Sequence, residues 1–169
     1  MKEKSKMVKL FFFCGLMIIM AQLSFQNAMG MEPKKLIGQT VYVPVYSHII
    51  LGERRKAKIK FDLSFSLSIR NTDPKNPITI IAVDYYDSDG TLVKKFVSEP
   101  TKVKPLASTY FFIKQSDSTG GWGANFIVEW KSEKKANEPI IEGVTFGARG
   151  SHSISFISRG KAIEEVSRN

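Results

Sequence analysis

The two histidines of the chain, His48 and His152, are the side chains best suited to hold a metal ion. With a carboxylate such as Asp84, they would supply the nitrogen and oxygen ligands of a divalent-metal site, as in a small metal-dependent hydrolase. Each histidine also lies beside a serine, Ser47 or Ser151. Adjacent residues on a strand point to opposite faces, so adjacency alone does not make a nucleophile–base pair. The simpler interpretation is two ordinary histidines near strand ends, with no metal and no cofactor.

A second candidate for cation binding is the acidic turn at residues 87–90. Asp87 and Asp89 resemble the start of a calcium-binding loop, but the fifth and twelfth positions of such a loop would be Thr91 and Ser98, which have no carboxylate. A hairpin turn explains these residues better, because Asp-Gly accepts the positive φ angles of a tight turn.

Asp84 itself lies inside an expected strand rather than in a turn. By strict alternation it shares a strand face with Ile80 and Ala82. If that face is buried, the carboxylate needs a partner, such as Arg70, a tyrosine hydroxyl or a cation.

The glycine-rich loop at residues 117–125 is the best candidate for ligand contact. A loop tryptophan such as Trp122 can stack on a sugar or enter a partner's pocket. Asn125, Asp117 and Asp73 are the polar candidates, and a ligand role for Asp73 requires Asp117 nearby. The simpler interpretation makes Trp122 a cap on the core and the polar residues turn formers.

The elements that must position these side chains are β-strands. Apolar and polar residues alternate from Ala57 to Arg70, which places the apolar side chains on one face of a strand. Seven more short strands, separated by turn-forming residues, are expected at 40–46, 78–86, 91–97, 106–114, 124–131, 140–146 and 153–158.

This pattern predicts an all-β fold, a single immunoglobulin-like antiparallel β-sandwich of about seven or eight strands over residues 31–160. A sandwich is favoured because the apolar face from Ile59 to Ile69 offers a surface for a second sheet to cover. Residues 161–169 are expected to be a charged C-terminal tail.

The N-terminus has the pattern of a secretory signal peptide. Lysines open it, an apolar run follows from Leu10 to Ala21, and the small residues Ala28 and Gly30 predict cleavage before Met31. A membrane-spanning helix needs roughly twenty apolar residues, so an uncleaved anchor is the less favoured alternative. We therefore expect an exported protein, periplasmic or secreted, that contacts the membrane only transiently, through its signal peptide.

Cleavage also changes the composition of the protein. Cys14 is the only cysteine, so the mature chain would have no disulfides, Cys-ligated metal or thiol catalysis. Without residues 1–30 the chain has 21 Lys and Arg against 15 Asp and Glu, a formal charge of +6 that favours anionic surfaces. The basic cluster at 54–60 is interpreted as an exposed strand face. An exported protein rarely meets nucleic acid, so we expect no nucleic-acid partner.

Several blocks of the sequence resemble a bacterial family of exported proteins. They are VYVPVYSHI at 41–49, LSIRNTD at 67–73, VDYYD at 83–87, GGWGANF at 120–126 and ISFISRG at 154–160. The family is the domain of unknown function numbered 3124, and the similarity spans about residues 40–160. It implies one exported bacterial domain without an assigned activity, and it transfers no catalytic residue.

The function expected from these features is a non-catalytic binding or interaction module of the bacterial cell envelope, with an envelope protein or glycan as partner. One alternative is the metal-dependent hydrolase, and another is a structural protein that assembles through a strand edge. Histidines and aspartates converging in one cleft would favour the enzyme. An exposed patch around Trp122 would favour binding, and an uncovered apolar edge would favour assembly.

Sequencing the N-terminus of the exported protein tests the predicted cleavage. We expect the first residue to be Met31, because the small residues before it suit signal peptidase. A chain that still begins at Met1 would contradict both the cleavage and the mature composition.

Overall fold

The computed structural model describes residues 33–54 and 57–166. The expected signal peptide, Cys14 and the expected cleavage site before Met31 lie outside the described residues. From Lys34 onward the chain forms one compact unit. No helix long and apolar enough to cross a membrane occurs in the described part of the chain.

The described chain consists of antiparallel β-strands, which confirms the predicted all-β sandwich. The strands are β1 (Lys35–Pro44), β2 (His48–Arg54), β3 (Ala57–Asp62), β4 (Ser64–Arg70), β5 (Ile78–Tyr86), β6 (Leu92–Lys95), β7 (Thr101–Val103), β8 (Ser108–Ile113), β9 (Asn125–Asn137), β10 (Ile140–Arg149), β11 (His152–Arg159) and β12 (Lys161–Glu165). These twelve strands exceed the seven or eight expected. One expected strand is divided into β3 and β4, and three others, β2, β7 and β12, were not predicted from the sequence.

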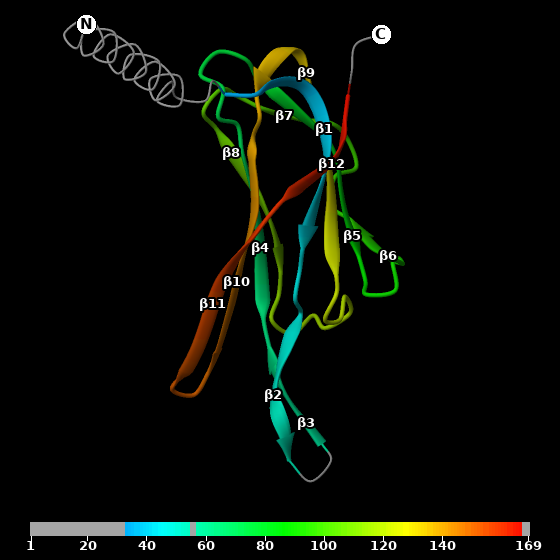
Figure 1. Cartoon of the computed structure of the whole chain (residues 1–169), viewed down its shortest axis with the longest axis vertical. Coiled ribbons are helices and arrows are strands. Elements are labelled where there is room, and N and C mark those ends of the chain that lie inside the picture. The colour runs from blue at the N-terminus through cyan, green and yellow to red at the C-terminus, as the bar shows by residue number, and fades with distance from the viewer. Residues whose placement is uncertain (1–32, 55–56, 167–169) are drawn as a thin grey trace, which may run out of the picture. The chain divides into compact units, whose positions relative to one another are not determined.

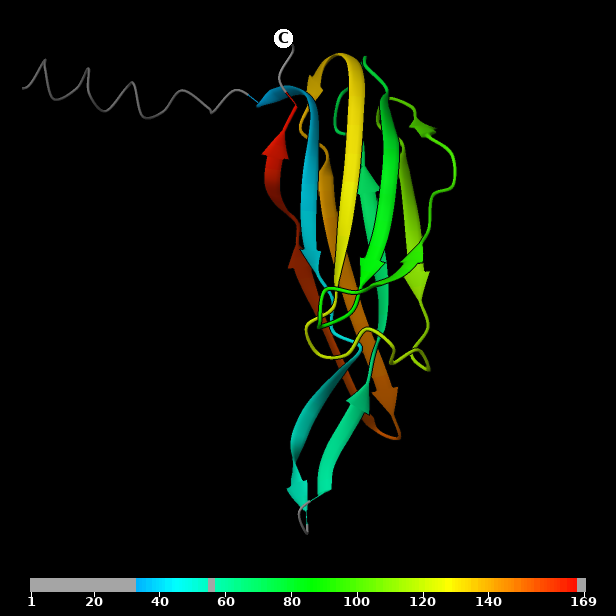
Figure 2. The same ribbon diagram turned by 90° about the vertical axis from the view of Figure 1, so that its right-hand side faces the viewer.

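Two sheets form the sandwich, and a separate hairpin extends from it (Figures 1 and 2). One sheet has the order β12-β1-β9-β5-β6, with β7 also paired to β5. The other has the order β11-β10-β4-β8. The third pairing joins β2 and β3 in a two-stranded arm beyond one end of the sandwich. The β10–β11 hairpin extends at the same end.

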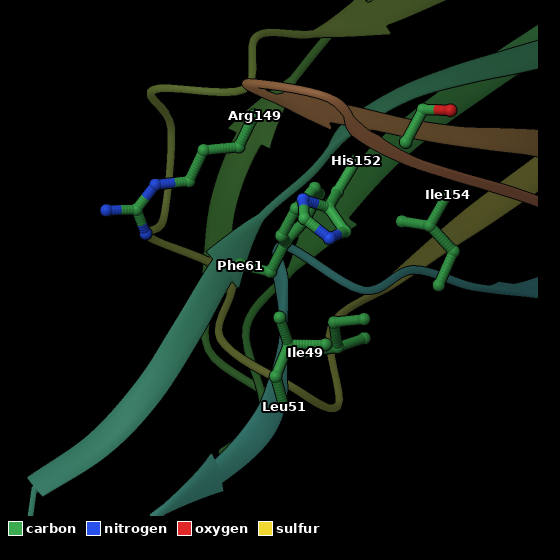
Figure 3. A pocket seen from close by; sticks show the side chains of 7 residues that line it. Ile49, Leu51, Phe61, Arg149, His152 and Ile154 are labelled. Carbon is green, nitrogen blue, oxygen red and sulfur yellow. The ribbon is translucent and has the colours of Figure 1, made fainter. Parts of the chain in front are cut away.

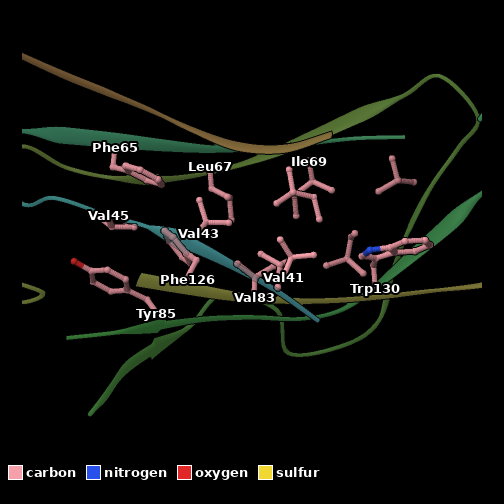
Figure 4. Close-up of a cluster of buried hydrophobic side chains, with 14 of the residues drawn as sticks. Val41, Val43, Val45, Phe65, Leu67, Ile69, Val83, Tyr85, Phe126 and Trp130 are labelled. Carbon is pink, nitrogen blue, oxygen red and sulfur yellow. The ribbon is translucent and has the colours of Figure 1, made fainter. Parts of the chain in front are cut away.

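The core lies between the inner faces of the two sheets (Figure 4). Phe65, Leu67 and Ile69 on β4 are almost fully buried against apolar side chains from β1, β5 and β9. The rings of Phe65 and Phe126 stack across the interface, with centroids 5.8 Å apart. The alternation that predicted the long strand therefore identified the core face of β4.

The long alternating segment does not remain in one sheet. It is divided at Leu63, whose N–H donates to the Ser47 carbonyl at 2.9 Å. The first half becomes β3 in the arm, and only the second half becomes β4 of the sandwich. The expectation that a second sheet covers the whole apolar face is therefore wrong at Ile59, which is 41% exposed. Alternation continues through both halves, so it cannot show that the pairing partner changes.

The C-terminal residues also differ from expectation. Instead of a tail beginning at Lys161, residues 161–165 form β12, an edge strand paired with β1. The sequence did not predict this strand, because most of its side chains are charged and an exposed edge strand needs no alternation of apolar and polar residues. Residues 167–169 lie outside the described part of the chain.

A glycine in β10 gives a test of the core. A Cβ added at Gly143 would lie 1.9 Å from Cζ of the buried Phe65 ring. We expect Gly143→Ala to lower the free energy of unfolding by about 1–3 kcal/mol, because the core has no room for the methyl group. Urea unfolding measures this. Ser66→Ala, on the outer face of the neighbouring strand, should change it by less than about 0.5 kcal/mol, and equal effects of the two variants would contradict this account of the core.

Candidate functional site

In the described part of the chain, a hollow lies between the two hairpins that extend past the sandwich. The β10–β11 turn is made by Gly150 and Ser151, and Gly150 has φ +61°. The base of the β2–β3 arm lies against β10, where a Cβ on Gly147 would come within 2.7 Å of both Phe61 and Leu63. This close approach fixes the spacing between the arm and the hairpin.

The hollow is a pocket of about 340 Å³ with apolar walls (Figure 3). Ile49, Leu51 and Phe61 come from the arm, and Ile154 comes from β11. Three polar residues complete the lining, namely Arg149, His152 and Ser153. Pockets that bind small molecules have this composition, with apolar walls and a few polar groups that orient the ligand.

The rim of this pocket carries positive charge. Arg149 and His152 are directly opposite each other across the β10–β11 turn. In Figure 3 the His152 ring is drawn close to Phe61, and the Arg149 side chain extends away from them. Arg149 takes part in none of the ion pairs found among the described residues. Its guanidinium is therefore available for an anionic group on a ligand.

An aromatic cluster continues from the pocket along the base of the arm. The Phe156 ring packs edge-on against Tyr46 at 5.6 Å, two residues along β11 from the pocket residue Ile154. The Trp122 ring packs edge-on against Tyr46 at 6.3 Å and against His48 at 6.1 Å. Trp122 is nevertheless 46% exposed and lies outside the buried core cluster. Trp122 therefore contributes a partly exposed aromatic face at the base of the arm, joined to β11 through Tyr46 and Phe156, rather than a cap on the core.

The glycines beside Trp122 are required by close contacts. A Cβ on Gly120 would meet the Tyr85 hydroxyl at 1.9 Å, and burial raises the pKa of that hydroxyl to about 12. Gly121 has φ +75°, and a Cβ there would lie 2.6 Å from the Ser88 Oγ. Ser88 Oγ donates to the Gly120 carbonyl at 3.0 Å and accepts from the Gly123 N–H at 2.8 Å. The loop that presents Trp122 is thus held against the sandwich.

Ser47 connects this loop to the arm, and its geometry corrects one expectation. Ser47 Oγ lies 3.0 Å from His48 Nδ1, so the two neighbouring side chains do meet, because β2 begins only at His48. However, Ser47 Oγ is buried and donates its one proton to the Gly121 carbonyl at 2.9 Å. His48 Nδ1 must then be the donor to Ser47 Oγ, which is the opposite of what a general base requires.

Asp73 and Asp117 do not meet. Asp73 follows the Arg70 end of β4, whereas Asp117 follows Ile113 of β8, and these strand ends lie at opposite ends of the β4–β8 ladder. Asp73 is buried and accepts hydrogen bonds from the N–H groups of Lys75, Asn76 and Asn137.

Both aspartates therefore organise turns. The backbone N–H of Asn76, followed by those of Lys75 and Asn137, lowers the pKa of Asp73 from 3.8 to about 2. Asp117 accepts from the N–H and the hydroxyl of Thr119. Asn125 is half-buried at the start of β9, opposite Pro44 and Tyr86.

In the described part of the chain, the three predicted metal ligands, His48, His152 and Asp84, do not lie together. No group of three or more His, Cys, Asp or Glu side chains there is placed to hold a metal ion. Asp84 faces away from the core, because a bulge between Ile80 and Ala82 reverses the alternation of β5. Its partner is Lys95, directly opposite on β6, with Nζ and Oδ2 4.0 Å apart. The acidic turn at 87–90 is a hairpin turn, in which Asp87 accepts from the N–H groups of Asp89 and Thr91.

A larger hollow of about 490 Å³ lies beside the β9–β10 turn, but its acidic groups already have partners. Glu138 accepts from the Gln39 side chain at 2.7 Å, and Glu142 pairs with Arg70 at 3.8 Å. The pocket between the hairpins therefore remains the better candidate site.

Of the predicted site residues, only His152 lines the pocket, and Trp122 and His48 join the aromatic cluster beside it. Residues 49, 51, 61, 149, 153 and 154 were missed. Their sequence pattern is that of ordinary strands, and only the meeting of two hairpins brings them together. One local feature of the sequence pointed to the pocket. The dipeptide Gly150-Ser151 favours a tight turn, and such a turn places Arg149 and His152 opposite each other.

The fold and the site together define a single-domain antiparallel β-sandwich with a ligand-sized pocket at one end. The model of the family described as "Protein of unknown function (DUF3124)" matches residues 38–163, and the chain belongs to this family. The family assignment made from the sequence blocks is thus confirmed. No curated protein matches the sequence. Among solved structures the chain is similar to "Crystal Structure of Thermotoga maritima 1070", with a TM-score of 0.44 and 13% identity over 80% of this chain and 100% of that chain.

The hydrogen bonds to Asp73 predict a pH dependence. Because the pKa of the folded state, about 2, lies below the ordinary value of 3.8, ionised Asp73 stabilises the fold above about pH 4. This stabilisation is lost as the pH falls toward 2. We expect Asp73→Asn to lower the free energy of unfolding at pH 7 by about 1–3 kcal/mol, and the difference from the unaltered protein to shrink between pH 4 and pH 2. Urea unfolding across this range measures it.

Asp89→Asn is the matched control, since Asp89 is exposed in the turn at the other end of β5. It should leave the stability almost unchanged at both ends of the range. A constant deficit of Asp73→Asn from pH 7 to pH 2 would show that ionisation of Asp73 is not the cause.

Proposed function

We propose that this protein is a non-catalytic binding module of the bacterial cell envelope, which holds its ligand in the pocket between the β2–β3 arm and the β10–β11 hairpin. The observation that carries the proposal is this pocket itself, with apolar walls from Ile49, Leu51, Phe61 and Ile154. At its rim lies Arg149, which forms no ion pair among the described residues.

The lining favours one ligand chemistry. Apolar walls attract a ligand group that is itself apolar, because its transfer out of water is favourable by about 25 cal/mol per Å². The guanidinium of Arg149 favours a carboxylate, sulfonate or phosphate at the mouth. The best fit is an apolar group that ends in an anionic one, of the size of a large side chain or a short acyl chain.

The exposed face of Trp122 supports a binding role. This large aromatic side chain has nearly half of its surface in solvent and lies at the base of the arm, on a loop held by Ser47 and Ser88. Rigid aromatic residues are frequent contributors to binding energy, because they present a large contact area with little conformational freedom to lose. An envelope protein or glycan is large enough to contact this face as well as the pocket.

The metal-dependent hydrolase gains no comparable support. Within the described residues, no three His, Cys, Asp or Glu side chains are placed to hold a metal ion, and Asp84 is paired with Lys95. Placement in the envelope rests on the N-terminal sequence pattern, which N-terminal sequencing tests separately.

Fluorescence of 1-anilinonaphthalene-8-sulfonate tests the pocket, because this probe joins an apolar ring system to an anionic sulfonate. We expect one site on the purified protein, from which both octanoate and octanol displace the probe. Ile154→Trp should abolish binding by filling the pocket. Arg149→Gln should weaken octanoate about tenfold, since a charged hydrogen bond contributes about 1.5–3 kcal/mol, and should leave octanol unchanged.

Arg159→Gln is the matched control, because it removes the same charge from the far end of β11. It should leave octanoate binding unchanged. Probe binding that is equally strong in Ile154→Trp, or no octanoate binding at all, would refute the proposed site.

A further inference from the structure

The two sheets of the sandwich differ in how their edges are protected. Natural proteins prevent unwanted strand pairing with short edge strands, lysines and bulges. The six-stranded sheet uses all three, since β6 and β7 have four and three residues and carry lysines, and the β12 and β6 pairings both contain a register shift. The four-stranded sheet has β11, which carries Arg159, at one edge and β8 at the other. The six residues of β8, STYFFI, include no charge, proline or glycine.

The pairing of β8 is regular, and its outer side is free. Its ladder with β4 runs through six residue pairs without a register shift. In an antiparallel ladder, half of the backbone N–H and C=O groups of an edge strand point away from the sheet. No strand other than β4 pairs with β8 in the described part of the chain, and no turn or side-chain hydrogen bond found there uses its free groups.

The side chains of β8 add apolar surface to this edge. On the outer face of the sheet, Tyr110 is 75% exposed and Phe112 is 49% exposed. Their neighbours in register on β4 are Ser68 and Ser66, which are too small to cover the rings. The edge therefore presents free backbone hydrogen-bonding groups together with two uncovered aromatic side chains.

We propose that β8 pairs with β8 of a second copy of this chain, in an antiparallel arrangement about a two-fold axis through Phe111. A free strand edge can pair with an extended strand of a partner. The sequence around Phe111 favours β8 of a second copy as that strand. Residues at equal distances on either side of Phe111 match in kind, with Tyr110 and Phe112 aromatic and Thr109 and Ile113 β-branched.

A two-fold axis through Phe111 satisfies the geometry of a sheet. Tyr110 of each copy lies opposite Phe112 of the other, so the outer faces of both copies remain on the same side. Cross-strand aromatic pairs of this kind stabilise antiparallel sheets. Lys114 lies opposite Ser108, so no like charges face each other. The result is a continuous eight-stranded sheet in which neither copy leaves its β8 edge unpaired.

Sedimentation equilibrium of the purified protein, expressed from the full-length chain, tests the pairing. The protein concentration runs from about 1 µM to about 500 µM, because a single edge contact is smaller than a standard interface and should bind weakly. We expect a reversible monomer–dimer equilibrium. Phe112→Lys should leave only monomer. The matched control is Ile157→Lys, since Ile157 is 60% exposed on the outer face at the opposite edge of the same sheet. It should dimerise like the unaltered protein.

Disulfide trapping tests the register in a way that does not depend on the lysine variants. In a Cys14→Ser background, protein with Tyr110→Cys and protein with Phe112→Cys are oxidised alone and as a mixture. Directly opposite residues lie within reach of a disulfide and diagonal ones do not. We expect covalent dimer from the mixture and little from either variant alone.

Far-ultraviolet circular dichroism confirms that each variant is folded. A protein that stays monomeric at all concentrations would overturn the proposal. Dimers that survive Phe112→Lys, or that are lost in Ile157→Lys, would place the contact elsewhere. Equal trapping in all three oxidations would show that the register is wrong.

Discussion

Packing of one face of β4 against the opposite sheet is the constraint on which the rest of the molecule depends. Phe65, Leu67 and Ile69 are nearly inaccessible to solvent, and Phe65 occupies the space beside Gly143 that a side chain would need. Because interiors are as dense as organic crystals, such a contact fixes the separation and the relative position of the two sheets. The neighbouring strands β10 and β8 then take their register from β4.

The position of the proposed binding pocket follows from the point where this packing ends. The residues before Leu63 form β3, which extends out of the sandwich. In the described part of the chain no second sheet lies over β3, and Ile59 is partly exposed. A two-stranded hairpin alone is only marginally stable in water. Here its base is held by Ser47 and by the contact of Phe61 with the Gly147 region of β10. The apolar side chains that the sandwich does not cover form a pocket with the neighbouring hairpin.

The two proposed surfaces share one physical origin, although they lie on different parts of the fold. In both places strands carry apolar side chains that no further layer or strand covers in the described part of the chain. There the arm has no second sheet over it, and β8 has no neighbour on its free side. Small proteins usually limit such exposure, so uncovered apolar groups at defined positions indicate binding surfaces.

The sequence alone determined the all-β class, the antiparallel sandwich, the family and the core face of β4, because strand periodicity and turn chemistry are local properties of the chain. It also identified most of the residues that form turns, such as Asp87. Only the tertiary structure decided the partner of each strand, the division at Leu63 and the bulge at Ile80 that turns Asp84 outward. It alone decided that His152 lies beside Ile49 and that His48 donates to Ser47. The reason is that a site depends on distances between segments far apart in the chain, and alternation has the same form whether a strand is covered by a sheet, by a hairpin or by nothing.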